Sequence, residues 1–208
     1  MTGIDHYITF LIAGILLNLT PGADTLYIVS RSVAQGRKAG VASAFGIMTG
    51  SIVHTTFAAF GLSAVLAASA LAYQTIKYLG AAYLLYLGVR MIIEKSHLLV
   101  GGKEIPPDPL RNIYRQGVFT NILNPKVALF FLSFLPQFID PNFAHGPIPF
   151  LILGLTFTTT GTLWCLVLAY SAASFTRRLR EHTASAKFMQ KLCGAVFVGL
   201  GLRLAIRN

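Results

Sequence analysis

Residues Thr20-Pro21-Gly22-Ala23-Asp24 interrupt an otherwise apolar stretch that runs from Tyr7 to Val29. A helix of that length, rising about 1.5 Å per residue, can cross the roughly 30 Å hydrocarbon core of a bilayer. Proline and glycine break a helix, and the freed backbone groups are tolerated in a membrane only where they face protein or line a cavity. Asp24 adds an ionisable group, which normally faces a protein interior or a water-filled path. The stretch therefore predicts a polar site near the membrane midplane, in a protein that moves a solute across.

The composition of the whole chain is that of an integral membrane protein. Of its 208 residues, 54% are hydrophobic and 12% are charged, whereas a soluble domain carries about twice that share of charge. The net charge of +10 is spread through the gaps between apolar runs, so we expect no nucleic-acid binding. Cys165 and Cys193 have neither metal-ligand nor Cys-x-x-Cys spacing, which predicts small packing residues. The N-terminus lacks the basic region of a signal peptide, so the first run is expected to remain in the mature protein.

Six apolar runs are each long enough for a transmembrane helix. They are approximately Tyr7–Ser30, Val41–Leu66, Tyr73–Ile93, Gly117–Phe138, Pro149–Phe175 and Phe188–Ile206. Most lysines and arginines between runs lie in the first, third and fifth connections, which predicts that these connections are cytoplasmic and both termini outside. The exceptions are Lys77, Arg203 and Arg207. Residues 94–116, rich in glycine and proline, predict a cytoplasmic linker, within which Leu110–Gln116 would form a short interfacial helix.

The two halves of the chain repeat one another. Thr20-Pro21 in the first run corresponds to Asn124-Pro125 in the fourth. Lys77-x-x-Gly80-Ala81 likewise corresponds to Lys191-x-x-Gly194-Ala195, and Leu87-Gly88 to Leu200-Gly201. With three spans in each half, the second copy must cross the membrane in the opposite direction, as in the inverted repeats of secondary transporters. The predicted fold is an all-α integral membrane protein of six transmembrane helices, a 3+3 inverted repeat over residues 1–93 and 117–208 with broken first and fourth helices.

The two prolines lie at the same predicted depth. Pro21 precedes Arg31 by ten residues and Pro125 follows Arg115 by ten, so each is about 15 Å from the cytoplasmic surface. The residues before them, Thr20 and Asn124, are of N-cap type. We therefore expect each span to stop and restart as a half-helix whose positive N-terminal end points into the centre.

The groups around these breaks suit a zwitterionic amino acid. The two half-helix ends, together with Lys126, would hold a carboxylate, and Asp24 would take an ammonium group. The residues leave alternatives open, because Asp24 and Lys126 could instead form a structural pair and Lys126 could extend towards a vestibule. His54, within the second run, is either a proton carrier or a packing histidine. Gly46 and Gly50 predict close helix packing.

Several of these motifs together resemble the LysE/RhtB family of amino-acid exporters, of the homoserine/threonine efflux type. The resemblance covers residues 8–205 and rests on the segment from Asn18 to Leu26, the Gly50–His54 region, the Gly80–Gly88 region and Asn124-Pro125-Lys126. It implies a multi-pass exporter of amino acids or their derivatives in the bacterial inner membrane, driven by the proton gradient. The family often has Pro-Gly-Pro where this chain has Pro21-Gly22-Ala23, a difference expected to soften the break without removing it.

These observations lead to one functional hypothesis, an amino-acid exporter that works by proton antiport and alternating access. The expected substrate-binding residues are Thr20, Pro21, Gly22, Asp24, Asn124, Pro125 and Lys126, and the expected proton-coupling residues are Asp24 and His54. We expect no enzyme activity, cofactor or metal; the partners are protons, the substrate and the lipid bilayer. The alternatives are an exporter of another small solute or cation, and a redox carrier or scaffold that transports nothing. The sequence decides neither the substrate nor whether the chain forms a homo-oligomer.

Overall fold

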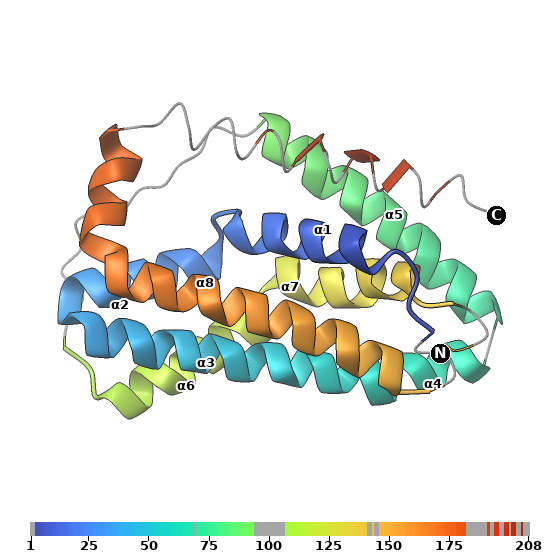
Figure 1. Ribbon diagram of the computed structural model, residues 1–208, viewed down its shortest axis with the longest axis horizontal. Helices are drawn as coiled ribbons and strands as arrows, with labels where there is room; N and C mark the ends of the chain where they lie inside the picture. The colour runs from blue at the N-terminus through green and yellow to red at the C-terminus, as the bar shows by residue number, and fades with distance from the viewer. Residues whose placement is uncertain are drawn as a thin grey trace.

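The computed structural model describes residues 3–68, 70–93, 107–140, 143 and 146–181, with isolated positions between 191 and 205. Helices make up nearly all of this part of the chain (Figure 1). They are α1 (Tyr7–Leu19), α2 (Ala23–Gln35), α3 (Arg37–Thr56), α4 (Ser63–Ala68), α5 (Ala70–Ile93), α6 (Leu110–Ile122), α7 (Pro125–Leu129) and α8 (Ile148–Glu181). Short turns of other helical types, η1 (Phe57–Leu62), η2 (Phe130–Phe134) and η3 (Leu135–Phe138), continue α3 and α7.

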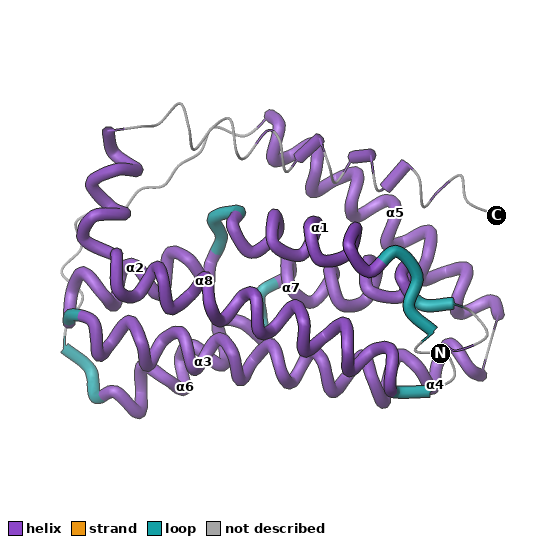
Figure 2. The backbone as a smooth tube through the Cα atoms, in the orientation of Figure 1, coloured by secondary structure: helices purple, strands orange, loops and turns teal. Residues whose placement is uncertain are grey.

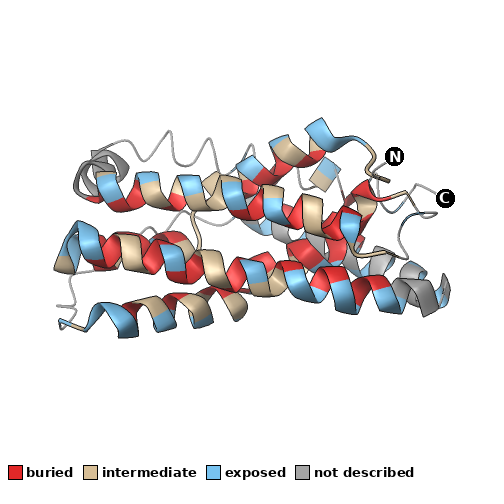
Figure 3. Ribbon diagram, turned by 60° about the horizontal axis from the view of Figure 1, so that its bottom comes forward, coloured by how far each residue is buried: buried red, intermediate tan, exposed pale blue. Residues whose placement is uncertain are grey.

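Several helices in the described part of the chain can cross a membrane. The stretches Arg37–Val65 and Ile148–Ala172 are long and apolar enough alone, and two bent helix pairs also qualify when each is taken as one span. Large apolar side chains lie on the outer surface, such as Ile8, 65% exposed, and Phe57, 70% exposed. Figure 3 shows exposed positions recurring along the helices. Such a surface suits lipid better than water. The structure therefore supports an all-α membrane protein; most of the predicted sixth run lies outside the described residues.

The fourth span begins earlier than the sequence predicted. We expected a separate interfacial helix over Leu110–Gln116, but α6 runs unbroken from Leu110 to Ile122. The reason is packing, because α6 lies along α3 at glycines that let the backbones touch. A Cβ atom on Gly46 would stand 2.2 Å from the Tyr114 carbonyl oxygen, and one on Gly117 would stand 2.9 Å from the Ser43 carbonyl oxygen. The prediction that Gly46 and Gly50 serve close helix packing is confirmed.

Two apolar clusters lie on either side of the helix breaks. The larger joins α1, η2, η3 and α8 through stacked and edge-on phenylalanines, with Phe10 and Phe134 fully buried. The smaller joins α2, α3 and α8 around Ile28 and Leu168. Cys165 belongs to the smaller cluster, which confirms its prediction as a packing residue, whereas Cys193 lies outside the described residues. Residues of both clusters, together with polar side chains, line one cavity.

Glycines that repeat in the two halves each pack closely against the other half. A Cβ atom on Gly88, in α5, would stand 2.6 Å from the carbonyl oxygen of Gly194. A Cβ atom on Gly201 would stand 3.0 Å from the carbonyl oxygen of Ala81, also in α5. Figure 1 shows the described C-terminal positions running beside α5. Side chains larger than hydrogen at these glycines would force the two segments apart.

Candidate substrate site at the two helix breaks

The first break lies between α1 and α2, which are bent by 47° about Thr20–Gly22. Thr20 ends α1: its Oγ1 donates to the Leu16 carbonyl oxygen at 2.8 Å, and its backbone is extended, as expected of a residue before proline. The N-cap of α2 is Gly22, without a side-chain cap. The prediction that Thr20 caps the restarted helix is therefore wrong, because it closes the preceding helix instead.

The second break separates α6 from α7 and has the predicted geometry. The Asn124 side chain accepts a hydrogen bond from the backbone N–H of Lys126 at 3.0 Å, and Pro125 is the first helical residue. Residues Leu110–Ile122 and Pro125–Phe138 are bent by 46°. The Asn124 cap is thus confirmed. Figure 2 shows both breaks as loop segments about midway along the molecule.

Lys126 connects the two breaks. Its Nζ donates to the carbonyl oxygens of Leu17 at 3.0 Å and of Thr20 at 2.8 Å. These are carbonyls at the C-terminal end of α1, which an α-helix leaves without partners and which carry partial negative charge. Gly22 lies beside the lysine, since a Cβ atom there would stand 3.4 Å from Nζ. The Lys126 ammonium group therefore supplies hydrogen bonds to carbonyl oxygens at the C-terminal end of α1, where the helix provides no donors.

Asp24 lies in the first turn of α2 and faces the second break. Its Oδ2 accepts a hydrogen bond from Asn121 Nδ2 at 3.0 Å. Its Oδ1 is buried and has no hydrogen-bond partner. Lys126 and His54 are near enough to act on the carboxylate electrostatically, and the amide groups of Asn121 and Asn124 lie beside it. A buried acceptor without a donor is rare in proteins, and it identifies a place where a ligand or water completes the site.

A small cavity of about 40 Å³ opens beside Asp24 and Lys126. Its polar lining comes from six helices, and the residues include Asn18, Asp24, Ser51, Asn121, Lys126 and Thr158. One water needs about 10–15 Å³, so the cavity has room for a few waters and is too small for an amino acid of ordinary size. The site therefore combines polar and apolar side chains around a space that fits only a few water molecules.

His54 lies next to this cavity but does not line it. Its Nε2 is 3.2 Å from the Asn121 carbonyl oxygen, and its ring stacks on Phe131 with the centroids 5.6 Å apart. The histidine instead borders a larger apolar groove of about 440 Å³ between η1 and η2. The structure therefore brings Asp24, Lys126 and both breaks together, and it joins His54 to them through Asn121.

Asn121 is the site residue that the sequence analysis missed. It is 2% exposed, contacts both Asp24 and His54, and lines the cavity. One signal could have found it: an amide side chain in an apolar run, one helical turn before Pro125, on the face that leads to the break.

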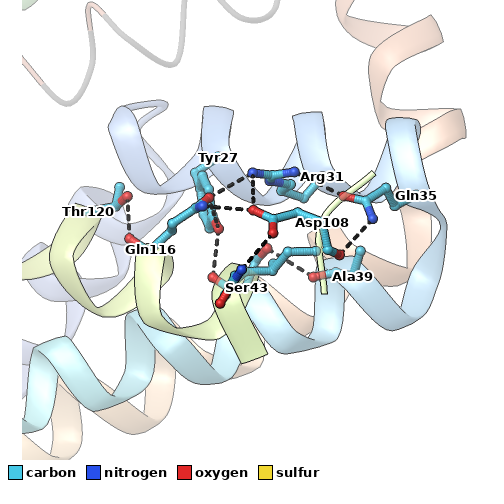
Figure 4. A network of polar contacts seen from close by, with 10 residues as sticks. Tyr27, Arg31, Gln35, Ala39, Ser43, Asp108, Gln116 and Thr120 are labelled. Atoms are coloured by element: carbon cyan, nitrogen blue, oxygen red, sulfur yellow. Dashed lines mark hydrogen bonds and ion pairs between the residues drawn. The ribbon is translucent and has the colours of Figure 1, made fainter. Parts of the chain in front are cut away.

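The end of α2 is tied to the start of α6 by a separate polar cluster (Figure 4). Arg31, 9% exposed, donates to Gln35 Oε1 at 2.9 Å and to Gln116 Oε1 at 2.7 Å, and lies 3.4 Å from Asp108 Oδ2. Gln116 Nε2 also donates to Asp108 Oδ2 at 2.8 Å. The basic-residue distribution predicts that this end faces the cytoplasm.

Comparison with known proteins identifies the family. The sequence matches the family described as LysE type translocator over residues 15–208. The chain belongs to the LysE translocator family. This confirms the resemblance that its motifs indicated. A search of the solved structures found no significant match.

Curated relatives of this translocator cover nearly its full length. It is 31% identical over 203 residues to the leucine efflux protein of Klebsiella pneumoniae subsp. pneumoniae, covering 98% of this chain and 96% of that protein. It is 32% identical over 207 residues to the leucine efflux protein of Enterobacter sp. (strain 638), covering 98% and 96%. It is 35% identical over 201 residues to the uncharacterized membrane protein YrhP of Bacillus subtilis (strain 168), covering 92% and 94%. These relatives support a multi-pass membrane protein that exports amino acids.

Proposed function

We propose that this translocator exports leucine, or an amino acid of similar size, across the bacterial inner membrane by proton antiport and alternating access. The observation that carries the proposal is the buried, unpartnered Oδ1 of Asp24, in a polar cavity where two helix breaks meet. Leucine is chosen because relatives of nearly equal length are named leucine efflux proteins. A transport role also accounts for ionisable groups inside the membrane, which are otherwise costly.

The two ends of an amino acid find complementary groups in the site. The ammonium group is placed against Asp24 Oδ1, a carboxylate oxygen without a donor. The carboxylate is placed at the N-terminal end of α2, which has no side-chain cap, where backbone N–H groups favour an anion. The Asn124 Nδ2, buried and without a hydrogen-bond partner, supplies a second donor. Lys126 holds the end of α1 and contributes its charge. Thr20, Pro21, Gly22 and Pro125 shape the breaks.

The glycine contacts support the proposed inverted repeat. Gly88 and Gly201 are corresponding residues of the two halves, and each packs on the other half near its Gly-Ala motif, at Gly194 or at Ala81. A pseudo-twofold axis relating two three-span halves produces such reciprocal contacts. In transporters built this way, one repeat rocks against the other around a fixed central site. The small size of the cavity fits a closed stage of that cycle, before or after the substrate has passed.

Proton coupling is assigned to Asp24 and His54. Asp24 is the carboxylate of the cavity, and its protonation removes the charge that holds the ammonium group, so proton and substrate exclude each other. His54 is linked to it through Asn121 and changes charge in the physiological pH range as histidines do. Mutual exclusion at one carboxylate is what an antiporter requires.

The experiment is efflux from proteoliposomes that contain the purified translocator. The vesicles are loaded with radiolabelled leucine, threonine, lysine or glutamate, and a pH gradient is imposed. The proposal expects leucine to leave fastest, and leucine efflux to stop when the gradient is collapsed with a protonophore. Efflux that proceeds equally without the gradient removes the antiport part, and no efflux of any of the four contradicts the transport proposal.

A further inference from the structure

The side-chain oxygen of Asn121 is a hydrogen-bond acceptor without a partner beside the proposed site. Its Nδ2 donates to Asp24 Oδ2 at 3.0 Å, and its Oδ1 is buried without a hydrogen-bond partner. The orientation of the amide follows from chemistry, because a carboxylate only accepts hydrogen bonds and the amide must turn its N–H towards it. The amide oxygen is thereby directed away from Asp24 Oδ2, on a side chain that lines the cavity.

Two unpartnered oxygens therefore belong to neighbouring side chains of one cavity, Asp24 Oδ1 and Asn121 Oδ1. Both are acceptors, and an ammonium group offers three N–H donors. Leaving such acceptors empty in a buried site costs free energy, whereas a primary ammonium satisfies both at once. A hydroxyl group would satisfy only one, because it has a single hydrogen.

Glycine at position 50 leaves space for the Asn121 side chain. A Cβ atom on Gly50, in α3, would stand 2.7 Å from Asn121 Cβ and 2.9 Å from Asn121 Oδ1. Real Cβ contacts almost never come so close, so the Asn121 side chain can keep its position only while residue 50 is glycine. A substitution at position 50 would thus act on the amide directly, because the atoms nearest to an added Cβ belong to Asn121 and Val118.

We infer that Asn121 is a binding residue for the substrate amine, accepting one ammonium N–H at Oδ1 while Asp24 accepts another. The site then selects amines that offer at least two N–H groups, and an amine with methyl groups in place of two hydrogens binds less tightly. The inference rests on the proposed function, since it assigns a further contact to the same substrate.

The test compares leucine with N,N-dimethylleucine, which keeps both charges but has a single N–H and so can satisfy only one of the two acceptors. Each is titrated against the purified full-length protein in nanodiscs, and the ratio of the two dissociation constants is measured. The wild type should prefer leucine by about tenfold, the value of one hydrogen bond to a charged group. In Asn121→Leu the preference should fall to about twofold or less because the acceptor is gone.

A purely structural role for Asn121 predicts that the ratio of the two dissociation constants stays the same in Asn121→Leu. Both ligands would then bind more weakly, or unchanged, with the wild-type ratio kept, and that result overturns the inference. A wild type without preference overturns it as well. If the wild type binds neither amino acid, the proposed function fails and the inference with it, whereas leucine binding with an unchanged ratio removes only the inference.

A second variant covers the case in which Asn121→Leu does not fold. Gly50→Ala displaces the amide through the contact described above and should reduce the same ratio. The matched control is Gly117→Ala, which strains the same α3–α6 interface, since its added Cβ atom would lie against the backbone of Ser43 and Gly46 and not against the Asn121 side chain, and which should keep the wild-type preference. Loss of preference in Gly117→Ala but not in Gly50→Ala contradicts the assignment.

Discussion

Lys126 Nζ lies 2.8 Å from the carbonyl oxygen of Thr20, so the residue after one helix-breaking proline binds the residue before the other. Pro21 and Pro125 are more than a hundred positions apart in the chain, yet this hydrogen bond brings their breaks together. The interrupted helices meet at one polar centre, where Asp24 contributes the carboxylate and Lys126 the ammonium group.

Removing the Lys126 ammonium should destabilise this centre. In Lys126→Met, the carbonyl oxygens of Leu17 and Thr20 lose a charged donor, at a cost of about 1.5–3 kcal/mol for a hydrogen bond to a charged group. We expect a clearly lower melting temperature of the purified protein in detergent, with weaker leucine binding. The control is Lys38→Met, at an exposed position. Equal melting temperatures for the two variants would show that Lys126 does not hold the breaks together.

Asp24→Asn should abolish proton-coupled efflux and leave the protein folded. The amide keeps the size of the carboxylate but has neither its charge nor a titrating proton. Leucine efflux under a pH gradient and size-exclusion profiles measure the two effects separately. Normal efflux by this variant would exclude Asp24 from the mechanism, and an aggregated profile would show that its role is structural.

His54→Phe should separate transport from proton coupling. The phenylalanine ring can keep the stacking on Phe131 but cannot carry a proton or bond to the Asn121 carbonyl oxygen. We expect exchange of internal for external leucine without a gradient to continue, while efflux driven by the pH gradient falls at least several-fold. If gradient-driven efflux and exchange both match the wild type, His54 is a packing histidine.

Asp108→Ala should loosen the end of the molecule where α2 meets α6. The substitution removes the carboxylate shared by Arg31 and Gln116 and leaves a largely buried guanidinium without its ion pair. Cys165 lines the central cavity and is buried, so its labelling by a thiol reagent reports access to the site. In a Cys193→Ser background, we expect faster labelling of Cys165 from the cytoplasmic side in Asp108→Ala than in the parent.

Leucine should slow that labelling in both proteins when it binds at the opened site. An unchanged labelling rate in Asp108→Ala would mean that the polar cluster around Arg31 and Asp108 does not control access to the site. Asn112→Ala is the matched control, because Asn112 also donates to Asp108 but lies on the exposed face of α6.

The sequence was sufficient to predict the features that depend on local chemistry. Proline positions predicted both breaks, and Asn124 before Pro125 predicted a cap, because a proline at the first helical position follows a side-chain acceptor. Thr20 was assigned wrongly for a related reason: its hydroxyl can bond forwards or backwards, and the extended Gly22 takes the N-cap position instead.

Features that depend on packing could not be predicted in the same way. The continuous α6 follows from glycine contacts between α3 and α6, whose register no single segment reveals. Asn121 became visible only when α6 was placed against α2 and α3, because its partners Asp24 and His54 are distant in the chain. For His54, the sequence predicted a residue inside the membrane, and the structure adds that Asn121 separates it from the cavity.

An experimental structure of the translocator with bound leucine tests the central claim most directly. The account predicts density for the amino acid between the two breaks, with its nitrogen within hydrogen-bonding distance of Asp24 and its carboxylate at the N-terminal end of α2. Leucine density elsewhere, with the space between the breaks filled by packed side chains, would contradict the account.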